Sequence, residues 1–403
     1  GWADTVGAYR LLSNERCDWR EIMDSHGRCA MQRMGELPVV LCLNDTTELD
    51  FNGQTIEGLG PLSYEAQRGM YLHPTYAVSA DREPLGVLDA WMWAREPKDA
   101  QGRRPGLGES VRWIESYERL AERAAQLPRT RLVQVGDRES DMLALMQCAA
   151  ALGWPVDLLV RSQHNRRLPS GRRLWDEVQA SAVLGEIRFT MGARPGRRAR
   201  VVRQELRALR VVVDRGASGP IEMTCLQAHE VGAPAGEKPV CWRLLTNRPA
   251  HDLASAQELI EWYRARWEIE MFFHVLKTGC RVESLQLASL AKIERALALY
   301  MVVSWRIARL MRLGRTCPDL PAALMFEPDE ISAAYVLTEK PVPSTPPRLN
   351  DVVRRVAMLG GFLARKGDGE PGVKTLWIGM QRVMDFATGV RFMRRSSAKL
   401  GCV

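Results

Sequence analysis

The sequence has no apolar run long enough to cross a lipid bilayer. Its longest strongly apolar run extends from Ala296 to Trp305 and lies between Arg295 and Arg306, whereas a membrane-spanning helix needs about 20 apolar residues. No signal peptide is recognisable either. The sequence therefore excludes a helical membrane protein and predicts a cytoplasmic protein without a membrane partner.

Cysteine and histidine are too sparse and scattered to form common structural sites. The nine cysteines are an odd number and include no C-x-x-C pair, and the six histidines add no metal-ligand spacing. A disulfide scaffold and a zinc site are thus both disfavoured, and a reducing cytosol is the simplest fit.

Lysine is scarce, so arginine carries most of the net charge of +8. The charge is unevenly placed. Between Arg161 and Arg215 there are 14 arginines, no lysine and five acidic residues, a local net charge of +9. Clustered positive charge indicates a polyanion partner, most often nucleic acid. Codon bias is the alternative, but it explains the preference for arginine over lysine and not the shortage of acids.

The chain is long enough for two or three packed units, and its first half predicts a mixed α/β sheet. Apolar runs with β-branched residues are typical of buried strands. Three such strands follow one another, and helices then alternate with two more. The expected strands are 38–44, 71–80, 85–93, 131–135 and 156–160, and the expected helices are 110–125 and 139–152.

The second half of the chain departs from this alternation. We expect a helical lead-in over 1–36, a first part of the α/β core over 37–161, an antiparallel β insertion over 162–240, the rest of the core over 241–315 and a helical C-terminal region over 316–403. The last region begins with a proline-rich stretch that reads as loop and linker, followed by helices over 350–364 and 375–388.

One stretch, from Tyr263 to Lys277, predicts a helix with an unusual polar face. It contains no Gly or Pro, and Asp252 and Ser255 precede it as capping residues. At about 100° per residue, one ~60° stripe contains Tyr263, Arg266, Glu270 and Lys277. This helix alone also fits a solvated face with i,i+4 ion pairs.

Two upstream acids give that carboxylate potential partners. Asp45 and Asp137 follow two predicted strands, at the edge where open α/β sheets bind ligands. Either acid alone could be a turn or capping residue. Together with Glu270 they form a set of three carboxylates that can hold two Mg²⁺ ions. Two metals can drive an in-line phosphoryl displacement by activating a hydroxyl and stabilising the leaving oxygen.

These residues resemble the acidic blocks of the DD-E transposases. The matching segments are Asn44-Asp-Thr-Thr47, Gly136-Asp-Arg-Glu-Ser-Asp141 and the spaced Tyr263, Arg266, Glu270 and Lys277. The last has the Tyr-Arg-Glu-Lys signature of the bacterial insertion-sequence-four family. The resemblance implies an RNase-H-like fold with a β insertion before the catalytic Glu and a helical C-terminal dimerisation region.

The resemblance also implies roles for individual residues. Asp45, Asp137 and Glu270 would form the catalytic, metal-binding triad, with Mg²⁺ as cofactor and Mn²⁺ as a substitute. The implied DNA-binding residues are Tyr263, Arg266, Lys277, Trp242, Arg161 and His164. Trp242 would stack on a flipped-out base; its alternative is an ordinary buried strand tryptophan.

The implied activity is cut-and-paste transposition in a bacterial cytoplasm, on nucleoid DNA. The enzyme would nick a transposon end, form and open a hairpin, and join the 3′-end to target DNA. It would act as a homodimer that brings two ends of double-stranded DNA into a synaptic complex. The chain starts at Gly1, without the helical end-recognition domain of the family. An alternative is therefore a truncated transposition inhibitor that acts through mixed dimers.

Overall fold

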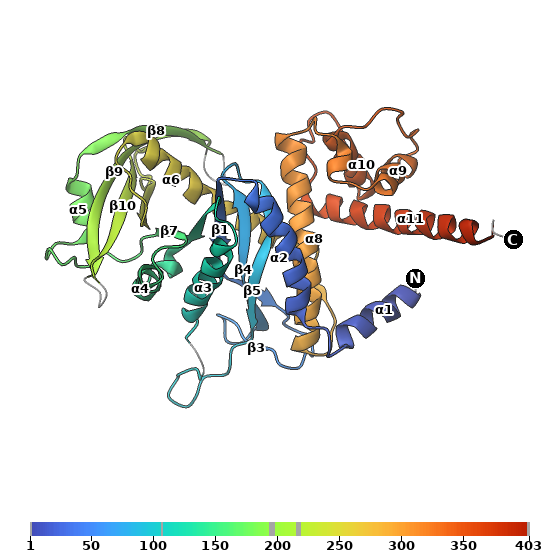
Figure 1. The fold of residues 1–403 in the computed structure, drawn as a ribbon, viewed down its shortest axis with the longest axis horizontal. Coiled ribbons are helices and arrows are strands. Elements are labelled where there is room, and N and C mark those ends of the chain that lie inside the picture. The colour runs from blue at the N-terminus through green and yellow to red at the C-terminus, as the bar shows by residue number, and fades with distance from the viewer. Residues whose placement is uncertain (1, 106–107, 193–197, 215–218, 401–403) are drawn as a thin grey trace.

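The computed structural model describes residues 2–105, 108–192, 198–214 and 219–400. The described residues form one 11-stranded sheet, covered by helices and followed by a helical C-terminal region (Figure 1). The strands are β1 (Val39–Asn44), β2 (Thr47–Asp50), β3 (Gly60–Pro61), β4 (Arg68–Ser79), β5 (Pro84–Trp93), β6 (Arg131–Gly136), β7 (Asp157–Arg161), β8 (Val183–Met191), β9 (Arg200–Asp214), β10 (Ile221–Glu230) and β11 (Cys241–Thr246).

The central strands are arranged in the order β5-β4-β1-β6-β7. Strands β5, β4 and β1 pair antiparallel, and β6 and β7 then continue the sheet parallel to β1. Three antiparallel strands, extended by two strands that run parallel to β1, form the RNase-H-like arrangement. The predicted fold class is therefore confirmed.

The predicted β insertion is an extension of the same sheet. Strand β11 pairs with β7, and β10, β9 and β8 follow it in antiparallel order. The segment also contains a helix that the sequence did not predict, α5 (Leu174–Ala180). Part of its positive charge, Arg194, Arg197 and Arg215, lies outside the described residues.

Both faces of the central sheet are buried, which explains the continuous apolar run in β1. Leu41 and Leu43 pack on one face with the helices around Phe272, whereas Val40 and Cys42 pack on the other with the helices around Trp113. The helices are α1 (Trp2–Ser13), α2 (Trp19–Gly35), α3 (Val111–Ala125), α4 (Leu143–Ala151), α6 (Leu253–Ala265), α7 (Trp267–His274), α8 (Leu290–Thr316), α9 (Pro328–Val336), α10 (Leu349–Leu359) and α11 (Val373–Leu400).

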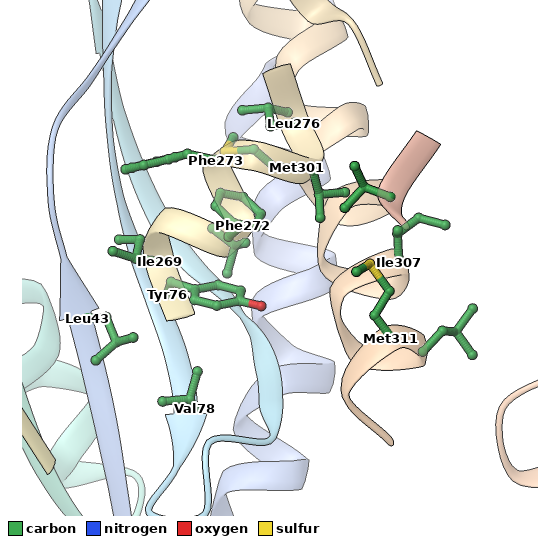
Figure 2. Packing of buried hydrophobic residues seen from close by; sticks show 14 of the residues in the cluster. Leu43, Tyr76, Val78, Ile269, Phe272, Phe273, Leu276, Met301, Ile307 and Met311 are labelled. Carbon is green, nitrogen blue, oxygen red and sulfur yellow. The ribbon is translucent and has the colours of Figure 1, made fainter. Parts of the chain in front are cut away.

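Helix α7 is anchored to the sheet by the apolar side chains that lie opposite the predicted polar stripe. Figure 2 shows Ile269, Phe272 and Leu276 directed into the buried cluster. The rings of Phe272 and Tyr76 stack with their centroids 4.7 Å apart. This packing fixes the orientation of α7, and its polar side chains therefore have a defined direction.

The long helix α8 lies between the sheet and the C-terminal helices α9, α10 and α11 (Figure 1). The sequence indicated only loop where α9 forms, after a capping box between Glu327 and Glu330. Helix α10 ends at Leu359 rather than near 364, and α11 extends beyond the predicted 388. Within the described residues, none of the helices has the length and apolar character that a membrane span requires.

The predicted continuous helix from Tyr263 to Lys277 is wrong in detail. Helix α6 begins after a capping box between Asp252 and Ser255, as expected, but ends at Ala265. Arg266 separates it from α7, and a π-helical turn follows at Val275–Gly279. A second correction concerns the predicted helix 139–152: Asp137 caps a short 3-10 turn, Arg138–Ser140, and α4 begins only at Leu143.

Candidate active site

Asp45 and Asp137 lie at the ends of two adjacent parallel strands. In the register of β1 and β6, Leu43 is opposite Val135, and each aspartate follows its strand residue by two positions. Neighbouring strands lie about 4.8 Å apart, so the shared edge of the sheet brings the two carboxylates together. Asp45 and Asp137 are 92 residues apart in sequence, and the sheet brings them to the same edge, where the sequence placed both.

Glu270 joins this edge from α7 through Arg266. The Nη1 atom of Arg266 lies 2.6 Å from Asp45 Oδ2, and its Nη2 atom lies 3.4 Å from Glu270 Oε1. The Asp45 and Arg266 side chains are only 16% and 14% exposed, whereas that of Glu270 is 41% exposed. One guanidinium thus links two of the three predicted carboxylates.

The environment of Asp45 disfavours its negative charge. Burial raises the pKa of Asp45 to about 6; Arg266 lowers it, and the nearby Asp137 and Glu270 raise it further. A hydrogen bond from the Thr46 backbone N–H, 2.8 Å from Asp45 Oδ1, favours the charged form. The net upward shift means that Arg266 and the Thr46 backbone N–H do not fully offset burial and the two neighbouring carboxylates.

The side chains present fit a divalent cation chemically, although they are not assembled as a metal cage. No group of three or more His, Cys, Asp or Glu side chains within the described residues is close enough to hold a metal ion. Arg266 supplies the positive charge beside Asp45 and Glu270. Carboxylate oxygens are nevertheless the ligands that Mg²⁺ prefers, with water completing its octahedron.

Tyr263 is buried rather than open at the surface. Burial raises the pKa of Tyr263, while Arg266 and Arg161 lower it, the latter also through a hydrogen bond to the tyrosine side chain. Arg161 and Arg266 therefore both lie near Tyr263, and Asp137 is close enough to raise the pKa of this tyrosine as well. The structure brings these three predicted DNA-binding residues together.

Trp242 lies on β11 beside this group. Its ring stacks on Phe189 at 5.9 Å and lies 6.5 Å from Tyr263. The side chain is half-buried and packs against the main core. Both interpretations of Trp242, base-stacking platform and packed strand residue, remain compatible with this position.

Lys277 and His164 lie apart from the carboxylates. Lys277 is in the π-helical turn, where its Nζ donates to the Glu48 carbonyl at 2.8 Å and pairs with Glu283 at 3.1 Å. The exposed His164 follows β7, and its backbone N–H donates to Asp141 Oδ2 at 2.9 Å. The single stripe predicted for the helix is thus divided into two parts.

Several residues that shape the site were not singled out by the sequence. Asp141 is buried, accepts the backbone N–H groups of Gln163 and His164, and pairs with Arg166. The buried His73 lies 2.9 Å from the Thr46 hydroxyl. Asp141 belongs to the second acidic block, which could have signalled it, but nothing in the sequence distinguishes His73 within its strand.

Two family models match the second half of the chain. Residues 162–305 match the family described as "Transposase DDE domain". Residues 302–400 match "Transposase Tn5 dimerisation domain". Residues 162–400 therefore match a transposase DDE domain followed by the dimerisation domain of a Tn5-type transposase.

A solved structure similar to the chain is a piggyBac transposase synaptic complex with hairpin DNA. The two chains are 8% identical, with a TM-score of 0.37, and the match covers 89% of this chain and 56% of that one. The matched region thus spans little more than half of the length of the piggyBac transposase chain.

Proposed function

We propose that this DDE transposase chain cuts double-stranded DNA at transposon ends and joins the freed 3′-ends to target DNA. The observation that carries the proposal is the meeting of Asp45, Asp137 and Glu270 around Arg266, from segments that lie 92 to 225 residues apart in sequence. Within the family, we assign the chain to the insertion-sequence-four group because of its Tyr-Arg-Glu-Lys spacing.

The reaction consists of phosphoryl transfers that need no redox or covalent enzyme chemistry. A water oxygen bonds to phosphorus, and the 3′-oxygen leaves and takes up a proton. That 3′-hydroxyl then attacks the opposite strand and forms a hairpin, with release of the flanking 3′-hydroxyl. Water opens the hairpin, and the 3′-hydroxyl finally attacks target DNA. Bound Mg²⁺, or Mn²⁺ in its place, would activate the entering oxygen and stabilise the leaving one.

The residues of this chain would position the DNA for these steps. Asp45, Asp137 and Glu270 would hold the metal. Arg161 and Arg266, both near Tyr263, would bind phosphates of the cleaved strand together with this tyrosine, because guanidinium groups match phosphate oxygens in charge and geometry. Lys277 and His164 would contact the backbone farther from the reacting phosphorus. Residues 302–400 would pair two protomers in a synaptic complex.

The direct test is Mg²⁺-dependent cleavage of DNA that ends in the element's terminal repeats. We expect Glu270→Gln to lower cleavage by about 10³-fold or more, because loss of metal-borne stabilisation costs several kcal/mol. DNA affinity should stay close to that of the parent chain. A matched control is Glu261→Gln, since Glu261 lies on α6 but pairs with Arg82 and Arg264. Substantial cleavage by the Glu270→Gln chain would exclude Glu270 from the triad.

A second candidate function is inhibition of transposition through mixed dimers. The match of residues 302–400 to a dimerisation domain favours it, because pairing does not depend on the carboxylates. In that case the parent chain should lower the cleavage rate of an active transposase in proportion to its concentration, and Glu270→Gln should inhibit equally well. A parent chain that cleaves DNA alone would exclude this alternative.

A further inference from the structure

A polar pocket opens beside the carboxylates, on the other side of them from Arg161, Trp242 and Tyr263. Its volume is about 300 Å³, at the lower end of the range of small-molecule sites. It is lined by the end of β5, the start of α3 and parts of β2 and β4, and we call it the β5–α3 pocket. Its lining residues are Thr46, Glu48, Ser63, Tyr71, Trp93, Arg95, Glu109, Ser110, Arg112, Trp113 and Glu139.

The sheet order places this pocket and three of the predicted DNA contacts on different sides of the carboxylates, whereas Lys277 donates to the backbone of Glu48 in the pocket lining. Asp45 and Asp137 follow the central strands β1 and β6. Arg161, Trp242 and Tyr263 come from β7, β11 and α6, beyond β6 in the sheet. The pocket is built from the β4 and β5 side. Thr46 and Glu139 connect it directly to the two aspartates.

Arg112, one of the two arginines in the pocket, has a hydrogen-bond donor that no described residue accepts. The buried Nη1 atom of Arg112 has no hydrogen-bond partner among the described residues. Its guanidinium stacks over Trp93, 3.1 Å from the ring centroid. Burial also lowers the pKa of Arg112 to about 10. Because an unpaired buried N–H is costly, this donor is suited to a ligand that brings an acceptor.

The other charged groups indicate what kind of ligand fits. Arg95 is already engaged, since it pairs with both oxygens of Glu109 and stacks on Tyr71. Three carboxylates, Glu48, Glu109 and Glu139, line the pocket against two guanidiniums. A phosphate would meet excess negative charge there. A neutral nucleobase, with acceptors for Arg112 and donors for a carboxylate such as Glu139, suits it better.

The steps in which a freed 3′-end attacks another strand bring a second DNA strand to the carboxylates. In an in-line displacement the entering and leaving oxygens lie on opposite sides of the phosphorus. When the freed 3′-end attacks another strand, that strand must approach away from the residues that bind the first. We propose that the β5–α3 pocket binds a nucleobase of this second strand and thereby sets its register over the carboxylates.

This inference rests on the proposed function but is testable without catalysis. Two DNA species hold a second strand in place: a hairpin end, and a branched molecule that mimics the joined target. Each is prepared with 5-iododeoxyuridine in the second strand, next to the junction. Photocrosslinking to this chain is then mapped by mass spectrometry. We expect crosslinks to Trp93, Tyr71 or Trp113, the aromatic lining of the pocket.

Two variants test the pocket by different means. Arg112→Gln removes the spare donor, and Ser110→Phe fills the space; Ser110 is exposed and makes no side-chain cap to α3. We expect Arg112→Gln to lower the crosslink yield about tenfold, which is the loss of one charge-assisted hydrogen bond. We expect Ser110→Phe to abolish the crosslinks to Trp93, Tyr71 and Trp113, because it excludes the base from the pocket. The control is Arg119→Gln. Arg119 lies on the same helix and stacks on Trp91, but it pairs with Asp89 outside the pocket.

The outcomes separate the two sources of the base and the two proposals. Crosslinks from the hairpin alone assign the pocket to the opposite strand, and crosslinks from the branched DNA alone assign it to target DNA. Crosslinks that map elsewhere, or that persist in both variants, overturn the inference. Circular dichroism confirms that each variant is folded. A chain that crosslinks but never cleaves would contradict the proposed function and leave the pocket assignment intact.

Discussion

Arg266 and Asp45 form an ion pair of 2.6 Å although 221 residues separate them in sequence. The pair is mostly buried and lies where the proposed metal site would be. Arg266 also reaches Glu270 at 3.4 Å, so its positive charge partly substitutes for a cation between two carboxylates. The same guanidinium is proposed to bind DNA phosphate. Arg266 would then release the carboxylate oxygens of Asp45 and Glu270 to the metal and bind phosphate oxygens of DNA instead. Metal and DNA would therefore have to bind together.

Asp45 predicts a pH dependence of stability in metal-free protein. Its pKa is raised from 3.8 to about 6, mainly by burial. Between these values the unfolded chain loses a proton that the folded chain keeps, so the free energy of unfolding falls as the pH rises. We expect Asp45→Asn to gain ~1–3 kcal/mol relative to the parent chain between pH 4 and pH 7.

Urea unfolding in EDTA, followed by tryptophan fluorescence at both pH values, measures this relative change. Any effect of the substitution that does not depend on pH cancels in the comparison. Asp24→Asn on α2, at an exposed position, controls for the exchange itself. A relative stability that does not change with pH would contradict the raised pKa of Asp45.

Trp242 predicts a selective effect on one chemical step. We expect Trp242→Ala to slow hairpin formation more than the first nick, because stacking on an extruded base contributes ~1–3 kcal/mol per base. The difference should be about tenfold in the ratio of the two rates. Time courses on end DNA, resolved into nicked and hairpin products, give both rates.

Phe189→Ala is the matched control for Trp242. Phe189 stacks on Trp242 at 5.9 Å and lies beneath Arg264, so its loss tests the packing of the same cluster. Equal slowing of both steps by Trp242→Ala would return Trp242 to a purely structural role. Equal selectivity in Phe189→Ala would show that the cluster acts as a unit.

The sequence predicted the central sheet well because its strands are buried on both faces. In β1, Leu41 and Val40 enter different cores, so the run is apolar throughout and easily recognised. Helix α9 was missed because it lies in a proline-rich region, where Pro328 occupies its first turn. Proline is well tolerated at that position, but there it looks like a loop signal.

The sequence named candidate site residues, but it could not predict the contacts that they make. The spacing of the Tyr263 to Lys277 segment singled out Glu270, since only local geometry was needed. The break at Arg266 was not predictable, because no Gly or Pro marks it and its partner Asp45 is distant in sequence. The β5–α3 pocket was not predictable either. Arg112 on α3 becomes part of a pocket only because it packs over Trp93 on β5.

The basic β insertion predicts a measurable salt dependence of DNA binding. Arg188 on β8 is exposed, and Arg203 on β9 is partly exposed and lies 3.6 Å from Glu186. If both meet phosphates, each contact releases counterions and contributes about 0.9 to the slope of log K against log salt. We expect Arg188→Glu and Arg203→Glu each to lower the magnitude of that slope by about 1. Fluorescence anisotropy with end DNA at several salt concentrations measures this slope.

The control variant is Arg348→Glu, in the C-terminal region, where the arginine side chain is 69% exposed. This substitution should leave the slope unchanged. Equal slopes in all four chains would attribute the arginine cluster to codon usage rather than to DNA.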